Sequence, residues 1–373
     1  MPVIVILIVV GLFFWIQLWV YKKNWSRHLT ASVDFKDHYL YEGAGTQVTE
    51  TLSNRKFLPL PWVQVKFEIF RNGATCNLFK SDVYNILFQQ KITRQSRQTF
   101  AKRGVYTVSS MDLISYDLFI STKFVRHIPA RAVITVYPKP VDRDLVEILY
   151  RRLMGTLTTR RYTLEDPFIF KGIREYRDGD SFRDINFAAS AKNMVGSGGE
   201  WLVNTHEYTV DQSVHILLLT DKATDYFDEN EYESALRLAA SFTTMLEEDQ
   251  IPVSFDTNGL DSLEGTQPGA AAGASPQHIN SVLDLLARLD VTKTGDAGPG
   301  KIKDLTGSRL EDQYFLIIAP DHSKDMLEAY QQLRQYTDAC LYLSPTSYRA
   351  LYGAEDKEKN LPDTVDDFYY FEV

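Results

Sequence analysis

The densest group of side chains that could do chemistry lies between Phe168 and Ala191. Charged residues of both signs gather there: Arg174, Glu175, Arg177, Asp178, Asp180, Arg183 and Asp184. Apolar and aromatic residues are interleaved with them, so part of this charge is expected to be buried, and a buried charge needs a partner of opposite sign. Three interpretations stay open: a structural clasp between two domains, a docking face for a partner, or a catalytic cluster.

Few other residue patterns in the sequence could support catalysis. The 2 cysteines and 7 histidines form no spaced ligand pair, so neither a disulfide framework nor a cysteine-based zinc site is expected. No GxSxG, P-loop or HExxH motif occurs. The formal net charge is -9, which does not suit a nucleic-acid binder. We therefore expect no catalytic residue and no nucleic-acid partner.

The chain opens with an uncharged apolar run from Val3 to Tyr21. At about 1.5 Å per residue, a helix of this length crosses the hydrocarbon core of a bilayer. Its one strongly polar side chain is Gln17, and basic residues follow at Lys22, Lys23, Arg27 and His28. A secretory signal would carry its positive charge before the apolar run.

The position of this basic cluster predicts how the chain sits in the membrane. We predict a retained single-pass transmembrane helix over residues 1–22, with residues 3–21 in the lipid bilayer of the cell membrane. The positive-inside rule places the soluble domains in the cytoplasm. An extracytoplasmic location of the same domains is the alternative.

Two folded parts are expected after the helix. In residues 30–140, apolar Val63, Val65, Phe67 and Ile69 alternate with their neighbours, which is the period of a half-buried strand and favours an antiparallel β-sandwich. In residues 212–373, buried-strand runs at 214–220 and 314–319 alternate with amphipathic helices at 231–246 and 277–289. This alternation is typical of a doubly wound α/β domain. The predicted class is an α+β multidomain chain.

The remaining segments are expected to be connections. Residues 141–211 form a connector that begins with a short helix at 144–153, and a polar linker follows at 155–166. Residues 259–276 and 292–300 are rich in small and polar residues, so both are predicted to be surface loops. The C-terminal run at 366–371 is predicted to be a final strand or a packed tail.

The charged stretch closely resembles the signature of the domain of unknown function 58 family, roughly G-x-R-E-Y-x-x-G-D-x-x-R-x-I-(D/N)-W-x-x-(S/T)-A. The matching residues are Gly172, Arg174, Glu175, Tyr176, Gly179, Asp180, Arg183, Ile185, Asn186, Phe187, Ser190 and Ala191. Asn186 and Phe187 stand where the family commonly has Asp and Trp. Residues 103–106, 117–119 and 136–138 also resemble the β-region of the family. Family members often start with two membrane helices, whereas this sequence shows one.

The C-terminal part of this family resembles von Willebrand factor A domains, which implies that fold for residues 212–373. Such domains often hold Mg²⁺ at a DxSxS motif after the first strand, completed by a later Thr and Asp. Asp221 matches the leading Asp, Asp225 replaces the second Ser, Ala223 replaces the first, and Asp321 is the candidate for the late Asp. Three neighbouring carboxylates repel one another without a cation. The alternative is a degenerate site in which Asp221 is a turn residue or a helix cap.

The resemblance also implies a partner, because family members are commonly encoded beside MoxR-type AAA+ ATPases. The expected function is a membrane-anchored, non-enzymatic adaptor that acts with such an ATPase in assembly or maturation of other proteins. The alternative is a membrane-bound, metal-dependent hydrolase that uses the Arg174–Asp184 cluster.

Overall fold

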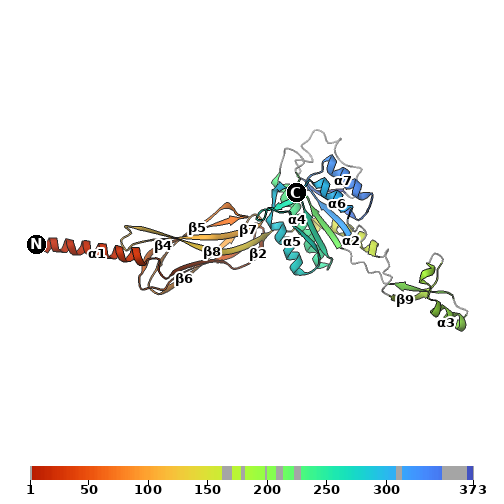
Figure 1. The fold of residues 1–373 in the computed structure, drawn as a ribbon, viewed down its shortest axis with the longest axis horizontal. Coiled ribbons are helices and arrows are strands. Elements are labelled where there is room, and N and C mark those ends of the chain that lie inside the picture. Colours follow the sequence, from red (N-terminus) through yellow and green to blue (C-terminus); the bar gives the residue numbers. More distant parts are fainter. Residues whose placement is uncertain are drawn as a thin grey trace. The chain divides into compact units, whose positions relative to one another are not determined.

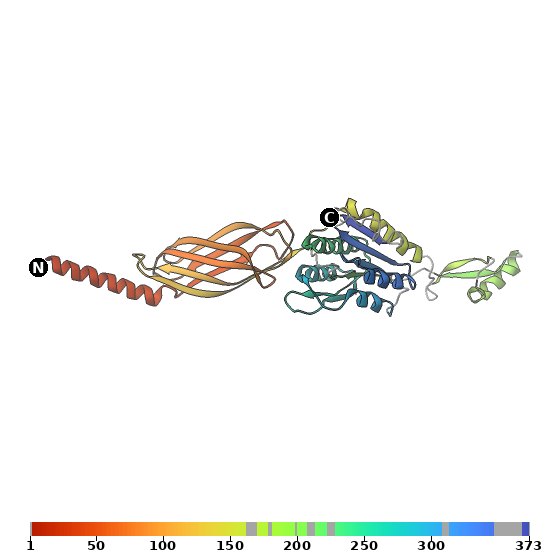
Figure 2. The same cartoon turned by 90° about the horizontal axis from the view of Figure 1, so that it is seen from above.

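The structure is a computed structural model that describes residues 2–161, 170–177, 181–197, 200–206, 213–221, 228–307, 313–346 and 368–372 (Figures 1 and 2). The chain forms two compact units that interleave in sequence. The first unit contains Met1–Lys139, Leu260–Gln267 and Asn280–Asp290. The second contains Pro140–Gly259, Pro268–Ile279 and Val291–Val373.

The first unit begins with the helix α1 (Pro2–Asn24), whose apolar side chains are largely exposed. Within the described residues, α1 is the one helix long and apolar enough to cross a membrane. Its last turn differs from the rest, because Tyr21 and the following Trp25 are buried in the core of the β-domain. The predicted N-terminal apolar helix is therefore confirmed, and its end is part of the folded domain.

Two sheets share the core of the first unit. One has the order β1-β3-β6, with strands β1 (Leu29–Phe35), β3 (Gly45–Asn54) and β6 (Gln90–Thr99). The other has the order β2-β8-β7-β4-β5, with strands β2 (Tyr39–Tyr41), β8 (Lys123–Tyr137), β7 (Gly104–Tyr116), β4 (Leu60–Arg71) and β5 (Ala74–Ile86). All pairs are antiparallel except β2 with β8.

The alternation seen in the sequence of β4 sets which face is buried. Val63, Val65, Phe67 and Ile69 all point into the core, where they join residues of β1 and β3 such as Val33 and Val48. Successive side chains of a strand point to opposite faces, so this period buries one face of the sheet. The predicted antiparallel β-region is confirmed.

Part of the helix α5 (Pro276–Arg288) also belongs to the first unit. The buried guanidinium of Arg103 donates hydrogen bonds to the carbonyl oxygens of Leu286, Ala287 and Leu289 at 2.9, 3.0 and 2.8 Å. A cation at the C-terminal end of a helix satisfies carbonyl groups that have no partner inside the helix. The sequence did not predict that residues so distant from the β-region belong to its compact unit.

The second unit contains a six-stranded sheet of order β14-β12-β11-β16-β17-β18. Five strands run parallel: β12 (Val253–Thr257), β11 (Ser213–Leu218), β16 (Gln313–Ile318), β17 (Cys340–Thr346) and β18 (Phe368–Glu372). The edge strand β14 (Gly269–Gly273) is antiparallel to β12. The predicted buried strands and the final C-terminal strand are confirmed, as is the alternation of strands with helices.

Helices cover this sheet. Leu217 of β11 and Phe315 and Ile317 of β16 pack in one cluster with α6 (Gly298–Leu305) and α7 (Lys324–Arg334). The long helix α4 (Glu229–Glu248) contacts strands of the same sheet. α2 (Arg143–Arg161) packs on α4, and the Tyr150 hydroxyl donates to the Met245 carbonyl at 3.0 Å.

Three predicted connections are wrong. The helix predicted at 144–153 continues to Arg161, so the first part of the predicted polar linker is helical. Residues 259–276 contain the strand β14 and the short strand β13 (Gly259–Asp261). Residues 292–300 contain the end of β15 (Leu289–Thr294), which pairs with β13, and the start of α6.

Close packing explains the small residues in β14. A side chain at Gly273 would place its Cβ 2.7 Å from the ring of His278, and one at Gly269 would meet the Phe255 carbonyl oxygen at 3.3 Å. Glycine in a strand often marks such a close approach. The small residues of β14, whose composition resembles that of a flexible loop, are thus required by its close neighbours.

The predicted connector also holds a folded element, which we call the signature module. It consists of β9 (Phe170–Glu175), the 3₁₀ turn η1 (Phe182–Asp184), α3 (Phe187–Ser197) and β10 (Leu202–His206). β9 and β10 pair in antiparallel fashion, and Ile185 forms an isolated bridge with Val203.

Candidate functional site

The charged residues of the signature module lie at its surface. Glu175 ends β9, Arg183 lies in η1, and both side chains are exposed. Arg174 donates from its guanidinium to the Glu175 carbonyl oxygen at 3.0 Å. Asp178, Gly179 and Asp180, which belong to the same stretch of the sequence, lie outside the described residues.

The uncharged polar residues of the signature hold the module together. The Asn186 side chain accepts a hydrogen bond from the Ala189 amide at 2.9 Å, which caps the start of α3, and donates to Asn204 at 2.8 Å. The Ser190 hydroxyl is buried, donates to the Asn186 carbonyl and accepts from the Leu202 amide, both at 2.8 Å. Asn186 and Ser190 therefore tie α3 to β10.

Two further signature residues, Gly172 and Tyr176, belong to the β9–β10 pairing. Gly172 lies opposite Thr205 in the register of the two strands. The Tyr176 amide donates to the Trp201 carbonyl at 2.7 Å, which extends the pairing beyond the end of β9. The described part of the signature thus combines a structural frame with exposed charges.

A second group of polar residues lies at the carboxyl edge of the parallel sheet. Asp221 follows β11, Asn258 follows β12 and Asp321 follows β16, and these three strands are neighbours. The carboxyl ends of parallel strands are where ligands bind in open α/β sheets. The structure therefore brings Asp221 and Asp321 to one edge, whereas Asp225 lies outside the described residues.

Both carboxylate oxygens of Asp221 already accept hydrogen bonds. Oδ1 accepts from the Gly298 amide at 2.9 Å, and Oδ2 accepts from Nδ2 of Asn258 at 2.5 Å. Asn258 is fully buried, and its own Oδ1 accepts from the Thr220 amide at 2.8 Å. Gly298 begins α6, so Asp221 acts as an anionic cap at the N-terminus of that helix.

Asp321 is bound to its own turn. Its Oδ1 accepts from the Ser323 amide at 2.8 Å and its Oδ2 from the Ser323 hydroxyl at 3.2 Å. Burial raises the pKa of Asp321, the Ser323 hydrogen bonds lower it, and the negative charge of Asp221 raises it further, so the net direction is upward. The Tyr342 hydroxyl donates to the Asp321 backbone carbonyl and fixes the turn from the β17 side.

The described part of this edge does not by itself fit a Mg²⁺ site. Hard cations take several oxygen ligands, yet no three His, Cys, Asp or Glu side chains gather in a metal-binding group among the described residues. The backbone of α6 also approaches closely, since a Cβ at Gly298 would stand 2.3 Å from Asp221 Oδ2. The described geometry is that of a helix-capping carboxylate.

The sequence did not point to Asn258 and Gly298, which fix the position of Asp221. Each carries a local signal. Asn258 precedes a glycine directly after a buried strand, and Gly298 precedes Pro299, a residue that favours the first turn of a helix. Neither signal says which carboxylate the residue contacts, because that contact joins segments distant in the sequence.

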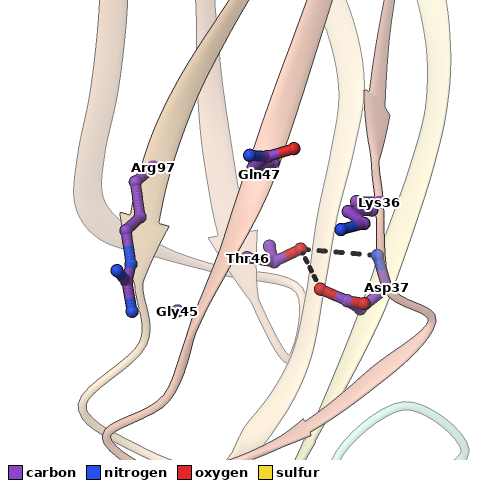
Figure 3. Close-up of a pocket in the computed structure, with 6 residues that line it drawn as sticks. All are labelled: Lys36, Asp37, Gly45, Thr46, Gln47 and Arg97. Atoms are coloured by element: carbon purple, nitrogen blue, oxygen red, sulfur yellow. Dashed lines mark hydrogen bonds between the residues drawn. The ribbon is translucent and has the colours of Figure 1, made fainter.

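A polar hollow on the first unit is lined by Lys36, Asp37, Gly45, Thr46, Gln47 and Arg97 (Figure 3). The Thr46 hydroxyl donates to the Asp37 carboxylate at 2.6 Å, and the Asp37 amide donates to the Thr46 oxygen at 3.4 Å. Figure 3 shows Lys36 next to Asp37 and Arg97 apart from the pair, on the side of Thr46. Asp37 and Thr46 are therefore hydrogen-bonded to each other within the hollow.

No family model matches the chain, and no curated protein matches it. Several solved structures match part of it. The CARDB domain of a Pyrococcus furiosus protein is 12% identical, covers 29% of this chain and 94% of that chain, and has a TM-score of 0.21. BslA, a bacterial hydrophobin, is 15% identical, covers 29% and 92%, and has a TM-score of 0.20.

A third match is Spo0M, a sporulation control protein from Bacillus subtilis. It is 11% identical, covers 39% of this chain and 58% of that chain, and has a TM-score of 0.19. Similarity at this level extends to the coarse description of an antiparallel β-region and carries no argument about activity.

Proposed function

We propose that this protein is a membrane-anchored, non-enzymatic adaptor. α1 holds it in the cell membrane as a single-pass anchor, and its soluble domains lie in the cytoplasm. The α/β domain, proposed to be doubly wound and von Willebrand factor A-like, binds a protein partner. The signature resembles that of the domain of unknown function 58 family, and this resemblance supports a MoxR-type AAA+ ATPase as that partner. The adaptor then serves assembly or maturation of other proteins.

The observation that carries the anchor is the way α1 ends. Tyr21 and Trp25 are only 4% and 7% exposed, and the Tyr21 hydroxyl donates to the Pro59 carbonyl at 2.8 Å. Removal of α1 as a leader would take the buried Tyr21 ring out of the domain core. Loss of a buried aromatic ring typically lowers the free energy of unfolding by about 3–5 kcal/mol. This supports a retained helix.

The residues at the sheet edge support binding over catalysis. Asp221 and Asp321 use their carboxylate oxygens to hold backbone amides and neighbouring side chains in place. A catalytic carboxylate, by contrast, needs an oxygen aimed at a substrate. The exposed charges Glu175 and Arg183 offer a surface that a charged partner can contact without chemistry.

The test is affinity purification of the full chain from mild detergent, once with Mg²⁺ and once with EDTA, with partners identified by mass spectrometry. We expect an AAA+ ATPase in both buffers, since the described edge does not rely on a cation. The variant E175K/R183E reverses two exposed charges and is expected to lower ATPase recovery about tenfold or more.

D34K/K36E, which reverses two exposed charges in the β-domain, is the matched control and should leave recovery unchanged. Loss of the ATPase only in EDTA would indicate that Asp221 belongs to a working metal site rather than acting as a helix cap. Absence of any AAA+ ATPase from both preparations would overturn the proposed partner.

A further inference from the structure

The turn that joins β7 to β8 lies along α1 rather than beyond its end. The ring of Phe119 stacks on Phe14, with centroids 5.6 Å apart and an interplanar angle of 28°, and meets Phe13 edge-on at 6.4 Å. Leu118, Phe119 and Ile120 are 45%, 52% and 58% exposed. Three consecutive apolar side chains are therefore exposed to solvent beside the apolar helix.

The height of these contacts along α1 sets the depth of the turn. Phe14 precedes Tyr21 by seven residues, which is about 10 Å along a helix that rises about 1.5 Å per residue. Tyr21 and the basic Lys22 and Lys23 are the residue types that lie at the membrane interface. Where α1 crosses a bilayer in this register, Phe119 is about 10 Å below the interface, within the hydrocarbon.

Several polar groups of the turn have hydrogen-bond partners within the protein, which lowers the cost of their entry into hydrocarbon. The buried Asp117 accepts hydrogen bonds from the Ser121 hydroxyl at 2.8 Å and from the Thr122 amide at 2.7 Å. It also accepts from Nε2 of Gln17 at 3.0 Å. This contact gives the one strongly polar side chain of the apolar run a partner on the turn itself.

Two neighbouring loops add apolar rings at the same end of the β-domain. Phe57 and Phe88 are both exposed and stack on each other, with centroids 6.5 Å apart. Their loops are held together by Asn54, which donates to the carbonyls of Leu58 at 3.0 Å and Leu87 at 2.9 Å. Since Tyr21 donates to Pro59 in the first of these loops, the rings lie near the level of Tyr21.

We propose that the 117–122 turn is a second membrane contact, which inserts Leu118, Phe119 and Ile120 among the acyl chains beside α1 without crossing the bilayer. Phe57 and Phe88 rest at the interface. The inference depends on the proposed membrane anchoring of α1. A helix alone lets a domain swivel, whereas a helix with an inserted turn fixes one end of the β-domain against the membrane.

The test uses the full chain in phospholipid vesicles, with a solvent-sensitive NBD label at one cysteine. The background is Cys76→Ser, because Cys340 is fully buried and Cys76 is not. Labels go to Phe119→Cys for the turn, Leu7→Cys for α1, and Phe79→Cys, an exposed aromatic position on β5, as the matched control. Each sample is quenched with aqueous iodide and with lipids that carry a nitroxide on the acyl chain.

The expected result is that labels at positions 119 and 7 are quenched by the acyl-chain nitroxide and protected from iodide by about fivefold relative to position 79. If position 7 is protected while position 119 is as accessible to iodide as position 79, the inserted turn is refuted and the anchor stands. If both positions 7 and 119 are accessible, the anchor itself fails. F119S with the label moved to Leu118→Cys should lose protection, which separates insertion from burial against protein.

Discussion

His215 is a titratable side chain placed where its charged form is disfavoured. It lies in the central strand β11, where Nδ1 is 2.9 Å from the Ser254 hydroxyl and the ring meets Phe315 edge-on at 5.9 Å. Burial lowers the pKa of His215, while the charge of Asp256 raises it and that of Lys301 lowers it further. The net direction is downward from 6.5.

This shift predicts that the second unit loses stability in mild acid. Between the lowered folded pKa and about 6.5, the unfolded chain binds a proton at this residue and the folded chain does not. The free energy of unfolding therefore decreases as the pH is lowered, by at most about 1.4 kcal/mol per pH unit. The thermal unfolding midpoint of the full chain in detergent, at pH 7.5 and 5.5, measures it.

The matched variant is His215→Phe, which keeps a ring against Phe315 and removes the titration. It should show a smaller drop in the midpoint between pH 7.5 and 5.5 than the natural chain. An equal drop in both proteins would mean that other groups cause the acid sensitivity.

At the residue scale, the sequence predicts chemistry better than contacts. The family resemblance offered Asp221 and Asp321 as candidate metal ligands, and the structure brings both to one sheet edge, because each follows one of two neighbouring strands. The sequence did not identify Asn258 as the partner of Asp221, since an amide makes the same local pattern in any turn. Whether a carboxylate caps a helix or holds a cation depends on which backbone approaches it, and here that backbone is α6.

At the scale of elements, α6 offers a matched pair of glycines. At Gly298 a Cβ would stand 2.3 Å from Asp221 Oδ2 and 2.6 Å from the Met326 side chain, whereas at Gly300 nothing lies within 4 Å. Gly298→Ala is therefore expected to destabilise the protein by about 1–3 kcal/mol, as overpacking does. Gly300→Ala should stabilise it by about 0.5–1 kcal/mol, because alanine is the better helix former.

Urea unfolding of the two variants, followed by the circular dichroism of the full chain, checks the sign of each change. Equal effects at both positions would show that the helix start does not press against Asp221. The close contact between Gly298 and Asp221 would then not contribute to the position of the helix cap.

The element scale also shows where pattern reasoning succeeds and where it fails. Strong periods predicted β4, α4 and the buried strands, since burial of one face repeats along the chain. β14 was missed because its glycines and alanines carry no such period, and only its neighbours Phe255 and His278 require small residues. The signature module was missed because Asn186 and Ser190 hold it by hydrogen bonds rather than by an apolar face.

At the scale of the whole molecule, the decisive property is the side of the membrane on which the soluble units lie. We propose a cytoplasmic location, because a basic cluster directly follows the apolar run and positive charge favours the cytoplasmic side. Lys23 lies over the Trp19 ring at 5.1 Å, and Arg126 donates to the Ser26 carbonyl at 2.6 Å. Positive charge from both the helix and the β-domain therefore gathers at one level.

This predicts the result of reporter fusions after Val373. A fluorescent protein that folds only in the cytoplasm should be bright, and an alkaline phosphatase that requires the periplasm should be inactive. Lys22→Glu combined with Lys23→Glu weakens the retention signal and should lower fluorescence and raise phosphatase activity. Lys36→Glu with Lys66→Glu, the same charge change within the β-domain, should alter neither reporter. Active phosphatase in the natural chain would reverse the orientation and, because AAA+ ATPases need cytoplasmic ATP, would remove the proposed partner as well.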